Sequence, residues 1–353
     1  MVDSPGVGTY LRHLVPLVVA ARPTWRFTLF GKTQTIGRLG WLEHDNVAAR
    51  EVAAPIYSVS EQIALLRAGH RGFDAFWSPH YNVPIAARAP LVVTVHDVIH
   101  LARPEFTRQF AKHAYARMMF ERVRRRAAAI VTVSEFTKQE FLRLVGESRA
   151  PVTVARNGVD RTWFVKRPAE PPREGRPYLL AVGSMKPHKN LPALINAFAS
   201  IRHLVPHDLL LVGRWKDMRT VDARVPTVAA EAGDRVRHLG EVSEPELRAL
   251  VAGAAVFVHP SLYEGFGLPP LEAMAAGVPC VVARAASMPE VCGDAAVYCD
   301  PRDPRDIANR LYEVLTNDAL RADLSERGPR RAGDFDWRRS AEIVVGQFDR
   351  VVS

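Results

Sequence analysis

Cysteines are few in this chain of 353 residues, and long apolar segments are absent. The three cysteines are Cys280, Cys292 and Cys299, an odd number with no CxxC pair, which argues against a disulfide framework and against a zinc cluster. No apolar run reaches the roughly 18 residues that a membrane-spanning helix needs. No charged segment followed by an apolar one opens the sequence, so we expect no secretion signal. These absences argue against an integral membrane protein and against a small secreted disulfide-bonded domain.

The composition is that of a globular protein, with 48% hydrophobic and 24% charged residues. At roughly 100–200 residues per domain, the length predicts about two domains. The net charge of +9 is concentrated in the first half, because residues 1–165 contain 22 Lys and Arg against 13 Asp and Glu. The remaining residues contain 25 of each kind. A basic half beside a neutral half indicates two domains with different partners, one of which is anionic.

Short β-rich runs alternate with helical stretches along the whole chain, a pattern typical of βαβ units and parallel sheets. Several runs, such as LVVTV and AVFVH, are almost entirely apolar, as expected of strands that are covered on both faces. The pattern therefore predicts an α/β protein. The expected strands are residues 25–31, 73–78, 90–95, 128–133, 152–155, 178–182, 209–212, 236–239, 255–259, 278–283 and 295–299.

Residues 166–177, KRPAEPPREGRP, have no periodicity and contain four prolines, which is the composition of a linker. We therefore expect an N-terminal domain over residues 1–165 and a C-terminal domain over residues 178–335. Residues 336–353 are expected to form a helix, and the sequence does not decide whether it stays on its own domain or crosses back to the first.

The beginning of the chain is unusual for an α/β domain. A glycine turn, Gly6-Val-Gly8, leads directly into an amphipathic helix over residues 11–20, and no strand precedes it. Either the first strand of the domain is missing from this chain, or the sheet is built without it.

The most informative segment is residues 259–280, HPSLYEGFGLPPLEAMAAGVPC. It places Glu264 and Glu272 on either side of a glycine turn and two prolines. Because proline suits the first turn of a helix, we expect a helix from near Leu268 to about Ala276, with Glu264 on the loop before it. Backbone N–H groups at the positive end of this helix could hold an anionic or hydroxyl-rich ligand. The alternative is a structural loop in which Glu272 only complements the helix dipole.

The string EGFGLPPLE, with seven residues between its glutamates, resembles the signature of the family-4 retaining glycosyltransferases, which use nucleotide-sugar donors and have the GT-B fold. Residues 178–191, YLLAVGSMKPHKNL, are similar to the phosphate-binding segment of that family. VTVHD at 93–97, VTVSEF at 131–136 and RNGVD at 156–160 lie in the expected order, so the resemblance spans essentially the whole chain. The combination looks closest to the bacterial mannosyltransferases of O-antigen and exopolysaccharide assembly.

The resemblance implies two Rossmann-like domains whose parallel sheets face each other across a cleft. It also implies transfer of a hexose, with mannose from GDP-mannose as the leading assignment, to a glycan or a lipid-linked glycan. Such an enzyme would be cytoplasmic, with peripheral contact to the inner membrane as a further expectation. The alternatives are a hexosyl- or rhamnosyltransferase with a UDP or dTDP donor, a non-catalytic sugar-nucleotide-binding relative, and a basic nucleic-acid-binding protein.

The resemblance also implies roles for three side chains at the reacting groups. Glu264 would contact the hydroxyls of the donor sugar. Lys189 would neutralise the departing diphosphate, which is the largest electrostatic demand when a glycosyl–phosphate bond breaks. His96 would touch the transferred sugar and polarise the reacting region; without the family resemblance, the preferred interpretation of this residue is a structural loop histidine.

Further residues are implied to bind the donor, through the backbone at the glycine turns and through a carboxylate on the ribose hydroxyls. They are Gly6, Gly8, Ser184, Phe266, Gly267, Leu268 and Glu272. Ser184 departs from the pattern, because many relatives have an arginine there, and Lys186 and Arg214 are the candidates to replace that charge.

The two glutamates are not expected to act as a nucleophile and an acid/base pair, the usual arrangement of retaining glycosidases. The family resemblance implies front-face chemistry instead, in which the leaving phosphate helps to deprotonate the acceptor hydroxyl. The work of the protein is then positioning and charge stabilisation.

No metal requirement is expected, and no cofactor besides the nucleotide-sugar donor. Asp334 and Asp336 spell DxD, a metal-binding motif of other glycosyltransferases, but Asp336 is better interpreted as the N-cap of the terminal helix. The histidines include no HxxxH pair with a nearby glutamate, so no zinc site is predicted.

The densest basic run is formed by Arg122, Arg124, Arg125 and Arg126. One interpretation is the solvated end of a helix, where cations complement the dipole. The other is contact with anionic lipid or a lipid-diphosphate acceptor. Nucleic-acid binding is disfavoured, because the run lacks interleaved aromatic residues and no nucleic-acid-binding motif is present.

Overall fold

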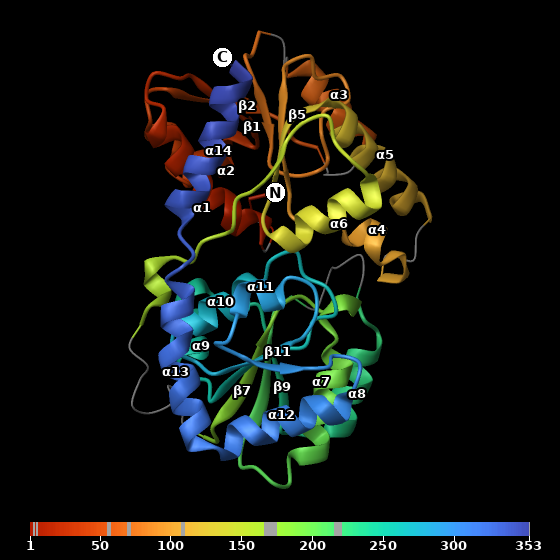
Figure 1. Ribbon diagram of the computed structural model, residues 1–353, viewed down its shortest axis with the longest axis vertical. Coiled ribbons are helices and arrows are strands. Elements are labelled where there is room, and N and C mark those ends of the chain that lie inside the picture. Colours follow the sequence, from red (N-terminus) through yellow and green to blue (C-terminus); the bar gives the residue numbers. More distant parts are fainter. Residues whose placement is uncertain are drawn as a thin grey trace. The chain divides into compact units, whose positions relative to one another are not determined.

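The computed structural model describes residues 1–2, 4, 6–54, 58–68, 72–106, 110–165, 175–214 and 221–352 (Figure 1). The chain divides into two compact units. The first comprises Met1–Pro104, Gln109–Gly158 and Asp336–Ser353, and the second comprises Glu105–Arg108 and Val159–Phe335. The division therefore falls at Gly158, earlier than the boundary expected at residue 165. Most of the predicted linker, residues 166–174, lies outside the described residues.

The second unit is built on a six-stranded sheet in which every neighbouring pair is parallel. Its strands lie in the order β12-β11-β10-β7-β8-β9. They are β7 (Tyr178–Val182), β8 (Asp208–Val212), β9 (Val236–Gly240), β10 (Val256–His259), β11 (Cys280–Ala283) and β12 (Val297–Cys299). Because β8 and β9 lie on one side of β7, and β10, β11 and β12 on the other, the strand order reverses between β7 and β10. This is the arrangement of a doubly wound sheet.

The helices of the second unit follow from its apolar periodicity and from proline and cap residues at their starts. α9 begins after Ser243, whose side chain accepts a hydrogen bond from the Glu246 N–H, and α12 begins after Asp303 in the same way. The helical elements are η3 (Arg161–Trp163), η4 (Pro187–Lys189), α7 (Leu191–Ile201), α8 (Arg224–Ala232), α9 (Glu244–Ala252), α10 (Leu268–Ala275), α11 (Met288–Cys292), α12 (Pro304–Thr316) and α13 (Asp318–Ala332).

The core of the second unit lies between the sheet and the helix pair α7 and α12, which pack against each other. Phe198 of α7 and Leu311 of α12 are completely buried, as are Leu179 of β7 and Val258 of β10. Burial of a large apolar side chain contributes about 1.5–3 kcal/mol. The central strands β7 and β10 are therefore firmly held, and the loops that follow them start from a rigid base.

The first unit contains two parallel sheets. The smaller one pairs β1 (Phe27–Gly31) with β2 (Val47–Glu51), and the larger one has the order β3-β4-β5-β6, with β3 (Phe76–Ser78), β4 (Leu91–Val95), β5 (Ala127–Thr132) and β6 (Val152–Val154). Its helical elements are α1 (Val7–Ala21), α2 (Thr33–Arg38), η1 (Trp41–Glu43), α3 (Val59–Arg67), α4 (Ile99–Ala102), α5 (Phe110–Arg126), α6 (Glu135–Val145) and α14 (Trp337–Val352). The short η2 (Pro104–Phe106) begins in this unit, and its other two residues belong to the second unit.

Among the described residues no strand precedes α1, as the sequence pattern predicts. Within the described residues, no strand pairing joins β1 and β2 to the four-stranded sheet. Aromatic side chains pack between the two sheets instead. The ring of Phe30 on β1 lies 5.6 Å from the ring of Phe76 on β3, measured between centroids.

The C-terminal helix α14 packs against α1, so it belongs to the first unit (Figure 1). The Trp337 indole stacks on the His13 ring with 5.1 Å between centroids, and Arg22 forms an ion pair with Asp349. The sequence left the position of this helix open. Its apolar face, which includes the buried Val344 and Phe348, is covered by the first unit.

Candidate active site

The residues predicted to bind the donor converge at the point where the strand order of the second sheet reverses. Ser184 and Lys189 follow the carboxyl end of β7, and Glu264 follows the carboxyl end of β10. β7 and β10 are neighbours in the sheet. In open parallel α/β sheets, ligands bind outside the carboxyl ends of the strands at such a switch point. The topology therefore brings together residues that lie 75 positions apart in the sequence.

Backbone hydrogen bonds fix the turn that carries Lys189 against the loop that carries Glu264. The Leu262 N–H donates to the His188 carbonyl at 2.8 Å. The Asn190 side chain, which is buried, donates from Nδ2 to the Pro301 carbonyl at 2.6 Å and to the Pro260 carbonyl at 3.2 Å. Asn190 also has φ 56°, the left-handed conformation that asparagine tolerates, and this bend starts α7 directly after the turn.

At the centre of the site, two donors hold one carboxylate oxygen. The Lys189 Nζ lies 2.6 Å from Glu264 Oε1, and both side chains are 15% exposed. The His259 Nε2 lies 3.1 Å from the same oxygen, and this ring is 2% exposed. Because an ionised carboxylate only accepts hydrogen bonds, His259 carries its proton on Nε2.

Burial and the interactions among Lys189, Glu264 and His259 together determine the charge state of each side chain. Burial would raise the pKa of the Glu264 carboxyl, but the Lys189 cation and the His259 hydrogen bond outweigh it and hold that pKa well below its usual range. Burial lowers the pKa of His259. Burial and the Lys189 charge lower the pKa of His188 to about 3. At neutral pH, Glu264 is therefore a carboxylate beside the Lys189 ammonium, and the rings of His259 and the neighbouring His188 are neutral.

The EGFG turn is anchored by the hydroxyl of Ser287, the N-cap residue of α11. The Ser287 Oγ, which is completely buried, lies 2.7 Å from the Phe266 carbonyl and 2.9 Å from the Glu264 carbonyl, and donates toward them. Gly267 caps α10 with φ 107°, which side chains rarely adopt, and a Cβ there would overlap the Met288 side chain. Glycine is therefore required at this position, and the turn is rigid.

The helix predicted after this turn is confirmed, since α10 begins at Leu268. Its first turn contains Pro269 and Pro270, which have no N–H. The expected anion site at this helix end therefore has fewer backbone donors than an ordinary helix start, namely those of Gly267 and Leu268. The side chains of Phe266 and Leu268 are buried, which leaves only their backbone for a ligand. Glu272 lies one turn inside the helix and is partly exposed.

The two cations considered as replacements for the arginine absent at Ser184 lie in different surroundings. Lys186 is exposed and precedes η4, close in sequence to Lys189. Arg214 forms an ion pair with Glu241 at 3.0 Å and is 49% exposed. Of the two, Lys186 belongs to the turn that also carries Lys189.

In the first unit, His96 follows β4 and is held from two sides. Its Nε2 lies 2.9 Å from the Pro79 carbonyl, so this nitrogen carries the proton and Nδ1 is left as an acceptor. The Tyr10 ring meets the imidazole edge-to-face at 4.7 Å, and the Tyr10 hydroxyl lies 3.1 Å from the Thr94 hydroxyl. Burial lowers the pKa of His96, so the ring is neutral at pH 7.

The glycine turn at the start of α1 lies beside the same histidine, since Tyr10 belongs to the second turn of this helix. Gly6 is the N-cap, with φ 79°. A Cβ at Gly8 would overlap the Val2 carbonyl, which the Arg12 guanidinium holds at 2.9 Å. The first unit therefore brings Gly6, Gly8 and His96 into one region.

The basic run at the end of α5 is largely paired within the protein. Glu121 binds Arg124 at 2.5 Å and also pairs with Arg125, and the Arg122 guanidinium donates to the Ile85 carbonyl. Arg126 is exposed. The charge that the run presents to a partner is thus smaller than its four arginines suggest.

Each aspartate of the DFD sequence has a partner within the chain. Asp336 accepts a hydrogen bond from the Arg338 N–H at 2.8 Å, as an N-cap of α14 does, and Asp334 pairs with Arg331 at 3.0 Å. In the part of the chain that the structure describes, no group of three or more His, Cys, Asp or Glu residues could hold a metal ion.

No described helix is long and apolar enough to cross a membrane. Each of the three cysteines is free and buried.

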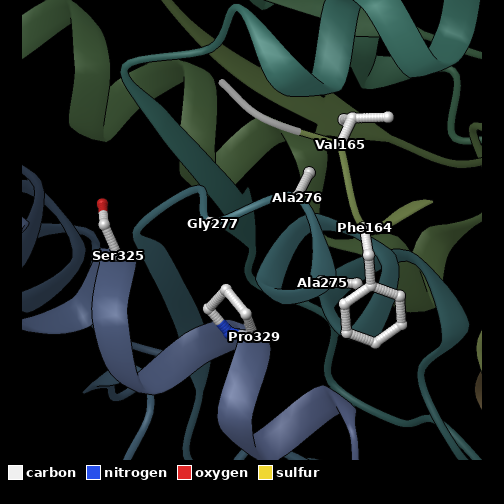
Figure 2. Close-up of a pocket in the computed structure, with 7 residues that line it drawn as sticks. All are labelled: Phe164, Val165, Ala275, Ala276, Gly277, Ser325 and Pro329. Atoms are coloured by element: carbon white, nitrogen blue, oxygen red, sulfur yellow. The ribbon is translucent and has the colours of Figure 1, made fainter. Parts of the chain in front are cut away.

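An apolar groove of about 360 Å³ lies at the opposite end of α10, between this helix and α13 (Figure 2). It contains none of the predicted site residues. Its lining consists of Phe164, Val165, Ala275, Ala276, Gly277, Ser325 and Pro329.

Sequence reasoning missed His259, Asn190, Ser287 and Tyr10. His259 and Asn190 lie inside the quoted motifs, but their roles depend on contacts made after folding. Ser287 and Tyr10 carry no local signal, because each acts on residues far away in the sequence.

Comparisons with known proteins agree with this arrangement. The model of the family "Glycosyl transferases group 1" matches residues 164–331, and that of "Glycosyltransferase Family 4" matches residues 50–163. The chain is 28% identical over 371 residues to the O-antigen chain mannosyltransferase B of Escherichia coli, covering 97% of this chain and 95% of the relative. It is 32% identical over 281 residues to an MMP alpha-(1->4)-mannosyltransferase of Mycolicibacterium hassiacum, covering 75% of this chain and 66% of the relative.

The fold matches solved structures over nearly the whole chain. The Anabaena protein HepE, crystallised in complex with UDP-glucose, superposes with a TM-score of 0.79 at 18% sequence identity, covering 99% of this chain and 97% of HepE. Family models, relatives and fold agree with the switch-point site and its EGFGLPPLE string. The chain belongs to the family-4 glycosyltransferases and has the GT-B fold.

Proposed function

We propose that the chain is a retaining mannosyltransferase that moves mannose from GDP-mannose to a glycan or a lipid-linked glycan. The observation that carries this proposal is the Lys189–Glu264–His259 group at the switch point of the second sheet. It offers one cation for a diphosphate and one ionised carboxylate for sugar hydroxyls, side by side at the place where α/β sheets bind ligands.

In the proposed complex, the Lys189 ammonium leaves Glu264 and pairs with the donor diphosphate. A phosphate oxygen competes well for this cation, because a diphosphate offers several charged acceptors. Glu264 then accepts hydrogen bonds from the sugar hydroxyls. Glu272 accepts from the ribose, and the N–H groups of Gly267 and Leu268 contribute donors at the start of α10.

Charge stabilisation of the leaving group is the main catalytic contribution in this proposal. Negative charge accumulates on the diphosphate as the glycosyl bond breaks, and Lys189 lies in a mostly buried setting where its charge acts strongly. The phosphate helps to deprotonate the acceptor hydroxyl on the same face, so no carboxylate nucleophile is assigned. No metal ion is assigned either.

The first unit contributes the acceptor side. His96, neutral and with a proton-free Nδ1, is suited to accept a hydrogen bond from a hydroxyl of the transferred sugar. Gly6 and Gly8 at the start of α1 are assigned to the donor diphosphate, with the Gly8 N–H exchanging the Ser4 carbonyl, which it binds at 2.8 Å, for a phosphate oxygen. Arg125 and Arg126 at the end of α5 provide the remaining exposed charge for an anionic lipid surface or a lipid-diphosphate acceptor.

The choice of mannose is supported by relatives named as mannosyltransferases at 28% and 32% identity. The HepE complex with UDP-glucose supports the alternative of a UDP-hexose donor. The two assignments differ in the nucleotide and in the sugar, so a donor screen separates them.

The test is release of nucleoside diphosphate from GDP-mannose, UDP-glucose and dTDP-rhamnose, each with and without a lipid-linked glycan acceptor. We expect release from GDP-mannose, and at least a hundredfold loss in Lys189→Met, because one preorganised charge contributes roughly that factor. Arg310→Met, which removes a partly exposed cation of α12 that pairs with Glu313, is the matched control and should keep full activity. Binding of a donor without release would identify a non-catalytic relative, and absence of binding to all three would refute the proposal.

A further inference from the structure

His259 contacts Glu264 of the site from a position that is closed to solvent. It is the last residue of β10, whose four residues are all buried, and its ring stacks over Phe257 with an interplanar angle of 17° and 6.4 Å between centroids. The ring is 2% exposed, whereas Lys189 and Glu264 are each 15% exposed. Within the described part of the chain, the hydrogen bond to Glu264 Oε1 is the one polar contact that its ring makes.

The two donors to this oxygen differ in mobility and in charge. Lys189 ends in an ammonium on a flexible four-carbon chain, so it can change partners. His259 is fixed by a central strand and donates from a neutral ring, because burial lowers its pKa. Only Oε1 of Glu264 has a hydrogen-bond partner within the described part of the chain, which leaves Oε2 for a ligand.

We propose that His259 is a positioning residue that keeps the Glu264 carboxylate oriented and ionised while Lys189 transfers to the ligand diphosphate. This inference rests on the proposed function. When Lys189 leaves, Glu264 loses its cation in a mostly buried place, and an ionised carboxylate there needs another donor. The Nε2–H of His259 remains on Oε1 and directs Oε2 to the sugar.

The proposal predicts a link between nucleotide binding and proton uptake. Without the His259 donor, departure of Lys189 leaves burial as the dominant influence on Glu264, so its pKa rises on binding and the carboxyl takes up a proton. Affinity in such a variant falls as the pH rises, by up to about tenfold per pH unit for one linked proton. A purely structural role for His259 creates no such linkage.

The experiment is isothermal titration calorimetry of GDP binding in buffers of different ionisation heat, which counts the protons taken up. We expect almost none for the wild type, close to one per GDP for His259→Leu, and a return toward the wild-type value for His259→Gln, whose amide also donates. His207→Leu is the matched control, since His207 is partly buried directly before β8 and should leave proton uptake unchanged. His259→Asn, whose amide is too short to reach Oε1, replaces the leucine variant if circular dichroism shows that the latter is unfolded.

Equal proton uptake in the wild type and in the His259→Leu or His259→Asn variant would overturn the positioning role and leave the proposed function standing. If the wild type binds neither GDP nor UDP nor dTDP, the proposed function fails, and this inference fails with it.

Discussion

Removing the Lys189 charge tests how the site is held together. In Lys189→Met the side chain keeps most of its volume, while Glu264 loses the cation that lies 2.6 Å from its Oε1. At an effective dielectric constant of about 20, this separation corresponds to roughly 6 kcal/mol of attraction. Desolvation of both charges offsets much of it, and loss of one partner of a buried pair typically costs about 3–5 kcal/mol. Because His259 still donates to Glu264, we expect about 3 kcal/mol of destabilisation at neutral pH.

The pH dependence of this loss has a definite sign. In the wild type the Glu264 pKa is depressed, so its contribution to stability is present above the unfolded pKa and disappears as the pH falls through the folded value. In Lys189→Met, only the His259 hydrogen bond opposes burial, so the folded pKa of Glu264 lies above that of the wild type while the carboxyl stays ionised at neutral pH. The difference in stability between the two proteins should therefore be largest at about pH 8 and should shrink toward pH 4.

Urea unfolding followed by circular dichroism at several pH values measures this difference. Arg214→Met is the control, because its partner Glu241 is half-exposed and such surface pairs contribute about 0–1 kcal/mol. The double variant Lys189→Met with Glu264→Gln removes both charges and should be more stable than Lys189→Met alone. A loss of stability in Lys189→Met that is independent of pH would refute the assignment to an uncompensated Glu264 carboxylate.

Three further predictions concern the turn, the carboxylate and the surface. Gly267→Ala should lower the free energy of unfolding by more than about 1 kcal/mol, because φ is 107° and a Cβ overlaps Met288, and a neutral effect in thermal unfolding would contradict the rigid turn. Glu264→Gln should reduce mannosyl transfer at least a hundredfold while GDP binding persists in calorimetry, and retained transfer would overturn its assignment. Replacing Arg125 and Arg126 by Glu should weaken sedimentation with anionic vesicles roughly tenfold or more, and unchanged sedimentation would dismiss the membrane contact.

The central strands were predictable from sequence because runs such as β7, β8 and β11 are almost entirely apolar. All eleven expected strands are present in the structure. β2 was missed, since the sequence VAARE alternates partly exposed and exposed residues and lacks the apolar signal of a covered strand. Its pairing with β1 is a non-local contact that local pattern does not reveal.

The members of the site were predictable as motifs, but their arrangement was not. The segments around Lys189 and Glu264 each carry a family pattern, whereas their direct ion pair depends on β7 and β10 being neighbours. His259 has no signal as a donor until its ring is placed against Oε1. The pairing of Arg124 with Glu121 is a spacing of three on one helix, so the reduced charge of the basic run could have been predicted from sequence.

The most direct test of the central claim is the anomeric configuration of the sugar transferred by the purified chain. Incubated with GDP-mannose and a lipid-linked glycan acceptor, the protein should release GDP and form a product whose NMR spectrum shows an α-mannosidic bond, the configuration of the donor. A β-mannosidic product, or transfer that survives in both Lys189→Met and Glu264→Gln, would contradict the account.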